Sequence, residues 1–292
     1  VRKLRLFTYH FAYQGIAGIN HRVGADGPWE PKRVLGTVNV ETDGSALFRV
    51  PANTPISVQP LDEHGQALQL MRSWMTAMPG EIVSCVGCHE RGPDVPPAKA
   101  TLATAKAPQE IQPWYGPVRG FSFLREVQPV LDHYCIGCHD GQPCDGKKTP
   151  DLRGNQGRVM TLRGGDPRVK TIEAGDVEKA AGSADGVFPP SYIHLRSHVR
   201  VGGLESDLRL LAPGEFGADT SELVQMLRKG HYGVKLTDEY WDRLITWIDL
   251  NAPCHGTWRE VVGLKRNIWD HPRRRELRKL YAGIDEDPET YP

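Results

Sequence analysis

The chain has 292 residues, 39% of them hydrophobic and 25% charged, and its 36 lysines and arginines equal its 36 aspartates and glutamates. This composition is typical of a globular protein, and the balanced charge gives no reason to expect nucleic acid as a partner. No apolar run is long enough to predict a transmembrane segment in this chain. The length allows two domains, each with its own core.

Residues 1–91 are expected to form a β-rich domain. Segments 33–41 and 46–50 flank a Thr-Asp-Gly-Ser turn, and segments 56–61 and 67–74 flank an Asp-Glu-His-Gly turn. Hairpins of short strands at this spacing are typical of a small β-sandwich. The predicted fold class is therefore α+β, beginning with a β-sandwich-like domain.

The β-rich domain runs into the sequence Cys-Val-Gly-Cys-His at 85–89, and the pattern recurs as Cys-Ile-Gly-Cys-His at 135–139. Cys-x-x-Cys-His is the attachment signature of c-type haem, in which both thiols bond the porphyrin and the histidine ligates the iron. Two copies predict two covalently bound haem c groups. The expected attachment residues are Cys85, Cys88, Cys135 and Cys138, and the expected proximal iron ligands are His89 and His139.

Two other interpretations of the four cysteines were weighed. A zinc ion could share the four thiolates, but their spacing is longer than that of a compact zinc ribbon, and both trailing histidines would be coincidental. A thioredoxin-like dithiol would need only one of the two pairs. Only haem attachment uses all four cysteines and both histidines.

Segment 92–117 is expected to be a linker, because it contains six prolines among alanine, lysine and threonine, and such a composition packs no core.

Residues 118–258 are expected to form an α-helical cytochrome c-like domain. Apolar residues at helical spacing over 123–134 run directly into the second motif. A capping box at 219–222 and a stop at Gly230 delimit another helix, and Thr237 caps a last one over 238–248. Region 141–217 is expected to be rich in loops. Residues 259–292 predict a basic helix followed by an acidic tail, both facing solvent.

Cys144 and Cys254 remain after haem attachment. Haem is joined to reduced thiols on the outer side of the energy-transducing membrane, so a periplasmic or otherwise extracytoplasmic location is expected, and disulfides are allowed there. We predict a disulfide between Cys144 and Cys254, with two buried thiols as the alternative. The chain contains no signal peptide, so a mature form or a segment of a longer protein is expected.

Several short blocks also occur in a specific order. They are PANTP at 51–55, VQPLD at 58–62, MRSW at 71–74, MPGE at 78–81, SCVGCHE at 84–90, VQPVLD at 127–132 and WIDLNAP at 247–253. In this order they resemble the C-terminal half of proteins related to the hydrazine synthase alpha subunit. The resemblance covers most of residues 1–255. It implies a middle domain with one c-haem and a C-terminal cytochrome domain with another, without the β-propeller that family members carry.

The resemblance also implies that the haem of the middle domain is a reaction centre. In hydrazine synthase that haem takes an axial tyrosine from just after its motif. Here Glu90-Arg91-Gly92-Pro93-Asp94 follows His89, and the next tyrosine is Tyr115. Ordinary ligation by His89 is therefore expected.

The second axial ligand decides whether each haem carries electrons or binds small molecules. For the haem at 135–139 we favour His231, which lies in a loop between two predicted helices, with His198 and His194 as alternatives.

For the haem at 85–89 the candidate ligands are His10, Met78 and Met75, and an open position is the alternative. Tyr9, His10 and Tyr13 are the candidate catalytic residues, because together they could line a polar distal pocket.

The predicted function is one-electron transfer through two haems, with a redox partner protein or further subunits of a multihaem assembly as partners. An oxidoreductase acting on a small nitrogen compound at the first haem is the competing prediction. A structural or docking module of a multihaem complex is the third.

Overall fold

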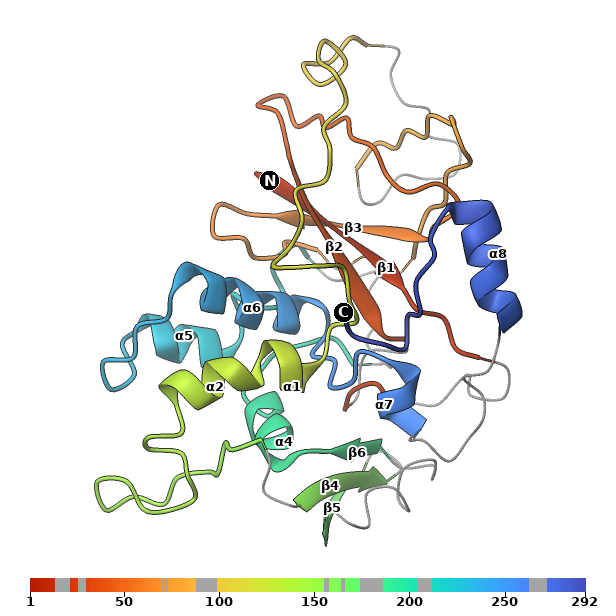
Figure 1. The fold of residues 1–292 in the computed structure, drawn as a ribbon. Helices are drawn as coiled ribbons and strands as arrows, with labels where there is room; N and C mark the ends of the chain where they lie inside the picture. The colour runs from red at the N-terminus through yellow and green to blue at the C-terminus, as the bar shows by residue number, and fades with distance from the viewer. Residues whose placement is uncertain are drawn as a thin grey trace.

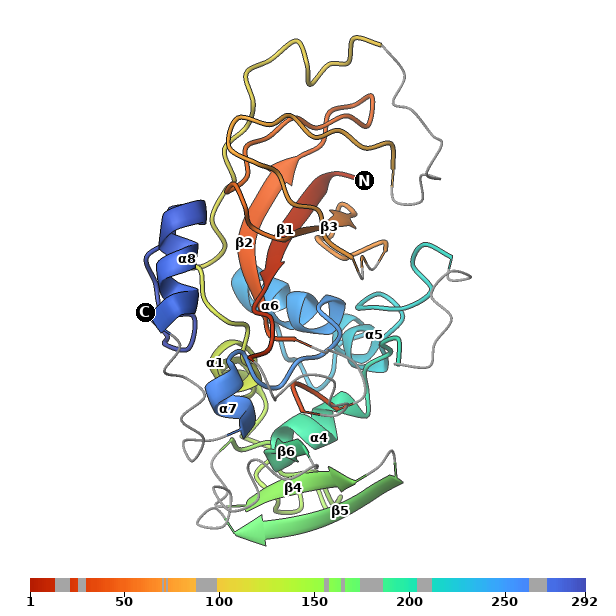
Figure 2. The same cartoon turned by 90° about the vertical axis from the view of Figure 1, so that its right-hand side faces the viewer.

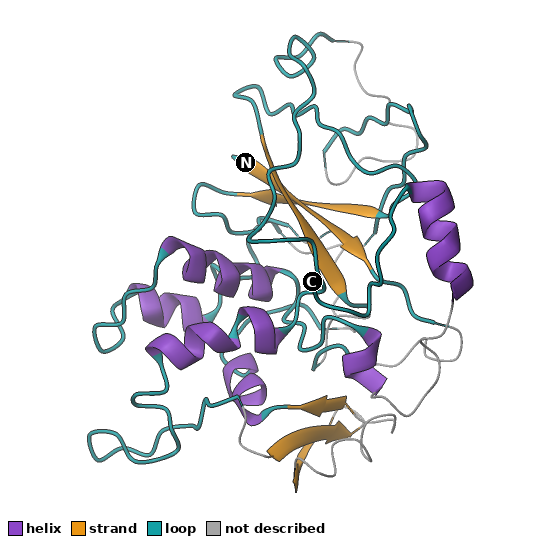
Figure 3. Ribbon diagram, in the orientation of Figure 1, coloured by secondary structure: helices purple, strands orange, loops and turns teal. Residues whose placement is uncertain are grey.

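The computed structural model of the chain describes residues 1–13, 22–25, 30–69, 71, 73–87, 99–154, 158–163, 166–173, 186–203, 212–262 and 272–292. Figure 1 shows two separate sheets with most of the helices between them, and Figure 3 separates these elements by type. Helix α8 (Pro272–Ala282) lies apart from the other helices, beside the first sheet.

The first sheet is antiparallel and has the strand order β2-β1-β3. β1 (Lys3–Tyr9) is central, between β2 (Lys32–Asn39) and β3 (Ile56–Leu61). Successive side chains of a strand point to opposite faces. Leu6 accordingly packs with β2 and β3 residues on one face, while Phe7 joins the main core on the other. Both faces of β1 are covered, which is why four consecutive residues of this strand are buried.

The expected β-sandwich is wrong, because the described part of 1–91 forms one three-stranded sheet rather than two. Strands were also predicted over 46–50 and 67–74, but these segments make only isolated bridges. The backbone of 46–50 bonds to Gln109, at 2.9 and 3.0 Å, instead of folding back on β2 as a hairpin. Its partner lies about sixty residues away, so local alternation could not reveal it.

Part of the segment expected to be a linker packs against the first sheet. Thr37 of β2 and Gln112 exchange two backbone hydrogen bonds of 3.0 and 2.9 Å. Gly36 has a φ of +143°, and a Cβ at this position would collide with the Gln112 carbonyl group. A glycine therefore permits the close crossing of the two segments. Ile111 and Trp114 then reach the cores on either side.

The helices of the second half largely follow the sequence pattern. The predicted helix over 123–134 is broken into α1 (Phe123–Glu126) and α2 (Gln128–Tyr134), because Pro129 at the start of α2 has no N–H to continue the ladder. α4 (Pro190–Arg196) and α5 (Glu222–Arg228) follow. In α6 (Asp238–Asp249) the Thr237 hydroxyl accepts the Tyr240 N–H at 3.4 Å, which confirms the predicted cap.

The capping box at 219–222 is wrong in its chemistry, although α5 begins where it was expected. The Ser221 hydroxyl donates to the Gly217 carbonyl at 2.8 Å and accepts the Arg200 N–H at 2.9 Å, so it ties two loops together rather than capping the helix. Gly230, with a φ of +92°, ends α5 as predicted.

The region 141–217 contains a second sheet that the sequence did not predict. β4 (Arg158–Arg163), β5 (Asp166–Glu173) and β6 (Gly186–Phe188) pair in the order β5-β4-β6. The second half of the chain is therefore mixed rather than all-helical. α7 (Trp258–Val262) precedes α8, whose described residues are all at least partly exposed, as predicted for the charged helix. Among the described helices, none is long and apolar enough to cross a membrane.

One core joins the two halves of the chain. The cluster around Trp247, Tyr192 and Phe123 also contains Phe7 and Val34 of the first sheet. The fully buried Asp249 of α6 accepts N–H groups from Ala67 and Ala218 at 2.8 and 3.0 Å, and it pairs with the buried Arg5 of β1 at 3.4 Å. These contacts hold α6 against the first sheet.

Candidate haem site

The second motif lies at the end of α2, where the helix changes into a tight turn. Cys135 caps α2, and the N–H groups of Cys138 and His139 both donate to its carbonyl oxygen, at 3.1 and 2.9 Å. Cys135 is half-buried against the main core, while Cys138 is exposed. Burial raises the pKa of the Cys135 thiol to about 11.

A loop over 140–152 folds back on the motif and holds it in place. The Thr149 hydroxyl donates to the Cys138 carbonyl at 2.8 Å, and the Leu152 N–H donates to the His139 carbonyl at 2.8 Å. The backbones of Asp140 and Asp151 pair in an isolated antiparallel β-bridge at the base of the loop. The backbone of His139 is thus held by Cys135, which precedes it, and by Leu152, which follows it.

The rings of His139 and His231 lie next to each other at this site. Their centroids are 6.1 Å apart, and their planes differ by 30°. Two metal–nitrogen bonds of about 2 Å each, together with half the width of each ring, come to about 6 Å. An iron between the two imidazoles therefore fits the observed separation.

The surroundings of His139 favour the form that binds a metal. Burial lowers the pKa of His139, and the nearby charge of His231 lowers it further, while the carbonyl of Pro150 acts in the opposite direction. Its Nδ1 is buried and makes no hydrogen bond of ordinary geometry. A neutral imidazole with one nitrogen turned into the protein is the arrangement expected of an axial ligand.

The loop that carries His231 has an unusual backbone. Gly230, Tyr232 and Gly233 all have left-handed φ values, of +92°, +46° and +76°. Glycine adopts these φ values without strain, so Tyr232 is the one residue of the three whose backbone is strained. The exposed Tyr232 packs edge-on against the His231 ring at 4.9 Å. The sequence signal for this loop was Gly230 alone.

The two alternative histidines lie in other surroundings. The exposed Nδ1 of His198 pairs with the Glu222 carboxylate at 3.0 Å. His194 lies on α4, where burial lowers its pKa and the Asp151 carboxylate raises it. Of the three candidates, the structure brings His231 to the motif histidine.

The first motif is only partly described, since Cys88 and His89 lie outside the described residues. All ten residues of 78–87, Cys85 among them, are exposed to solvent. Met78 is 67% exposed, and Met75 packs under the first sheet beside Ile56. Both methionines stay candidate ligands of the first haem, because His89 lies outside the described residues.

The structure places Tyr9, His10 and Tyr13 around one cavity, as the sequence suggested, but His10 is engaged elsewhere. The buried Nε2 of His10 pairs with the Glu289 carboxylate near the end of the chain. The carboxylate thus engages this nitrogen, and His10 as a ligand of the first haem stays a prediction, because His89 lies outside the described residues. Tyr9 stacks on Phe11 at 5.9 Å, and both rings contact Trp74.

The predicted disulfide is absent from the structure, in which Cys144 and Cys254 are both free. Cys254 is fully buried in the main core, and this burial raises its pKa. Cys144 lies in the loop after the second motif, where it contacts Cys138. The prediction failed because it paired the two cysteines by elimination, without knowing which of them enters the core.

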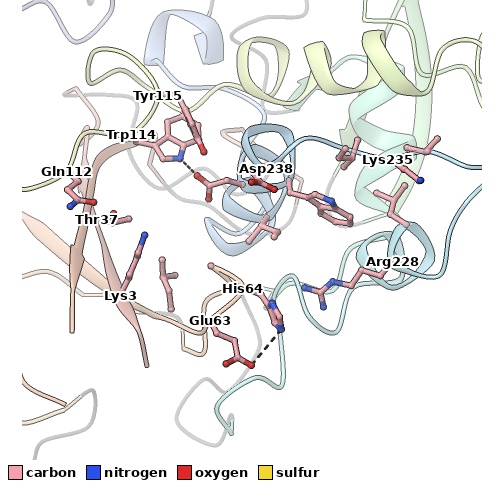
Figure 4. Close-up of a pocket in the computed structure, with 18 of the residues that line it drawn as sticks. Lys3, Thr37, Glu63, His64, Gln112, Trp114, Tyr115, Arg228, Lys235 and Asp238 are labelled. Atoms are coloured by element: carbon pink, nitrogen blue, oxygen red, sulfur yellow. Dashed lines mark hydrogen bonds and ion pairs between the residues drawn. The ribbon is translucent and has the colours of Figure 1, made fainter. Parts of the chain in front are cut away.

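A cavity of 1090 Å³ lies behind the His231 loop, between the first sheet and the helices (Figure 4). Lys3 and Thr37 line it from the sheet, and Lys235 and Asp238 line it from the loop and the start of α6. The His231 loop thus separates this cavity from the second motif. Within the described ranges, no three His, Cys, Asp or Glu side chains gather as they would around a single metal ion.

Comparison with known proteins gives one family match and a structural match. Residues 1–90 match the family model of the hydrazine synthase alpha subunit middle domain. Among solved structures, the hydrazine synthase of Kuenenia stuttgartiensis matches with a TM-score of 0.54 and 18% sequence identity, over 87% of this chain and 39% of that chain. A search of curated proteins gave no match.

The chain therefore has a hydrazine synthase-like fold. Its residues 1–90 are similar to the middle domain of the hydrazine synthase alpha subunit, in line with the predicted resemblance, and the chain spans about two fifths of the length of the solved structure that it matches.

Proposed function

We propose that the chain is a c-type cytochrome that transfers single electrons through a haem attached at Cys135 and Cys138, with His139 and His231 as its two axial ligands. The observation that carries this proposal is the separation of 6.1 Å between the two imidazole rings. A haem bound there would supply a one-electron iron couple. Two nitrogen ligands close both axial positions, and this favours electron transfer over binding of a substrate.

The chain's own contribution is to keep this site rigid. The loop over 140–152 fixes the motif backbone, and the half-buried Cys135 anchors it to the main core. A rigid site changes little between two oxidation states, so each electron transfer requires little rearrangement.

A second haem c is proposed at Cys85 and Cys88, with His89 as the proximal ligand. The match of residues 1–90 to the hydrazine synthase alpha subunit middle domain supports a second candidate function at this haem, an oxidoreductase acting on a small nitrogen compound. The engagement of His10 with Glu289 favours an accessible axial position at the first haem.

Haem attachment at two motifs implies an extracytoplasmic location, and electron transfer implies a redox partner or further subunits. A docking module in a multihaem complex is the third candidate, supported by the structural match to hydrazine synthase.

The test is to produce the chain in cells that attach c-type haem and to measure its intact mass after denaturation. A mass increase of two haems is expected. Electron paramagnetic resonance should then show one low-spin centre that does not respond to nitric oxide. A mass increase matching zinc, or two centres that both bind nitric oxide, would contradict the proposal.

A further inference from the structure

A second cavity, of 580 Å³, lies between the C-terminal end of β1 and helix α8. Both views show α8 standing beside the first sheet (Figures 1 and 2). One part of the lining is apolar and includes Phe11, Pro55, Leu277 and Tyr281. The other part is cationic. It consists of Arg33 from β2 and Arg273, Arg274 and Arg278 from α8.

The charges around this cavity do not balance. None of the described residues that line it is acidic. One carboxylate from outside the lining, Glu286, serves both Arg33, at 2.9 Å, and Arg278, at 3.1 Å. Arg274 donates to the Phe11 carbonyl at 2.6 Å and lies 4.5 Å from the Tyr13 ring centre, and it has no carboxylate partner among the described residues. Arg273 pairs with Glu276 at 3.6 Å, so Arg274 is the lining arginine that has no carboxylate at ion-pair distance in the described part of the chain.

Two guanidinium nitrogens in the same wall lack hydrogen-bond acceptors. The Nε of Arg33 and one Nη of Arg278 are buried, and neither has a partner in the described part of the chain. The Arg33 side chain is only 6% exposed. A buried donor without an acceptor costs free energy. An anion in the cavity would supply a counter-charge for Arg274, which has no carboxylate partner among the described residues.

We propose that this cavity binds a small organic anion, with a carboxylate or phosphate group held by the arginines and an apolar body packed on Phe11, Leu277 and Tyr281. Guanidinium groups bind the oxygens of either group through two parallel N–H donors. The volume is within the range of small-molecule sites and far exceeds the need of an inorganic ion alone. The positive charge excludes ammonium-like compounds, so this site is distinct in chemistry from the haem sites and does not depend on the proposed function.

The test is calorimetric titration of the haem-loaded chain with benzoate, with the neutral analogue benzamide, and with inorganic phosphate. Benzoate should bind and benzamide should not. Arg274→Gln should weaken benzoate binding at least tenfold. The matched control is Arg275→Gln, because this neighbour pairs with Asp285 on the exposed side of α8 and does not line the cavity. The control should bind benzoate like the unmodified chain.

Competition by phosphate would assign the site to phosphate-bearing compounds, and binding of benzoate without competition would assign it to carboxylates. If Arg274→Gln fails to fold, Leu277→Glu provides a second variant, since it places a carboxylate inside the cavity and should abolish benzoate binding. Equal binding of benzamide, no binding of either anion, or unchanged benzoate affinity in both variants would overturn the proposal.

Discussion

The two Cys-x-x-Cys-His motifs share four of five residues but lie in very different surroundings. The second is wrapped by a folded loop, anchored to the main core through Cys135, and faced by His231. The first is described only over Cys85–Gly87, and these residues and the preceding segment 78–84 are exposed. On the proposed function, the packing around the second motif would close its iron with His231, so the same five-residue pattern would serve two differently surrounded haems.

The sharpest test of this difference is His231→Ala. Loss of the second axial ligand should convert the haem at 135–139 from low-spin to high-spin and let it bind carbon monoxide. Electron paramagnetic resonance and optical spectra with carbon monoxide measure both changes. His198→Ala is the matched control, because His198 pairs with an exposed carboxylate and should leave the spectra unchanged. A low-spin spectrum in His231→Ala would assign the ligand to another residue.

A second test asks whether the two regions fold as one unit. Trp247 is fully buried, contacts Phe123 and Tyr192, and donates its indole N–H to the Pro253 carbonyl at 3.0 Å. Trp247→Ala should lower the free energy of unfolding by about 3–5 kcal/mol.

Denaturant unfolding of this variant should remain a single transition, because the same core contains Phe7 and Val34 of the first sheet. Leu280→Ala is the control, since Leu280 is 70% exposed on α8 and should change stability little. Two separate transitions, with only one shifted, would show that the halves fold independently.

A smaller effect is expected from Thr237→Ala, which removes the cap of α6 next to the His231 loop. Loss of a side-chain cap costs about 1 kcal/mol of stability. The cap hydrogen bond of Thr237 is long, at 3.4 Å, so we expect a loss of no more than this. Thermal unfolding gives the stability change, while the spectrum of the second haem should stay low-spin. Thr237→Ser should restore the cap. A high-spin haem in Thr237→Ala would mean that the cap, and not only packing, holds His231 in place.

The smallest effect concerns pH. His255 is buried, and its Nε2 interacts with the Val187 carbonyl of β6 at 2.9 Å. Burial lowers the pKa of His255, while the Glu260 carboxylate and the Val187 carbonyl act in the opposite direction. The unfolded chain therefore binds a proton at higher pH than the folded chain. The stability that the neutral, buried His255 contributes is fully present above the ordinary histidine pKa of about 6.5. It is lost as the pH falls below that value.

The free energy of unfolding, measured by denaturant titration at a series of pH values, should thus fall on acidification. In His255→Gln the fall should be shallower than in the unmodified chain. His64→Gln is the control, because His64 is exposed and its removal should leave the slope unchanged. An identical slope in His255→Gln would exclude this residue as a source of acid sensitivity.

The sequence alone predicted those features whose chemistry is local. The two motifs, the start and end of α5, the cap of α6 and the strands β2 and β3 all depend on residues within a few positions of one another. The order of short blocks was sufficient to point to the hydrazine synthase alpha subunit, whose middle-domain model matches residues 1–90. Such features survive in the sequence because capping, turn formation and haem attachment each need particular residue types at short, fixed spacings.

Only the tertiary structure decided which distant groups meet. His231 faces His139 across 92 positions, while His198 pairs with Glu222 and His10 pairs with Glu289. Cys254 lies in the core. Residues 109–112 pair with β2 and with the segment 46–50, which was expected to form a hairpin with β2. These choices depend on burying apolar surface and satisfying buried polar groups over the whole chain, and no local pattern carries that information.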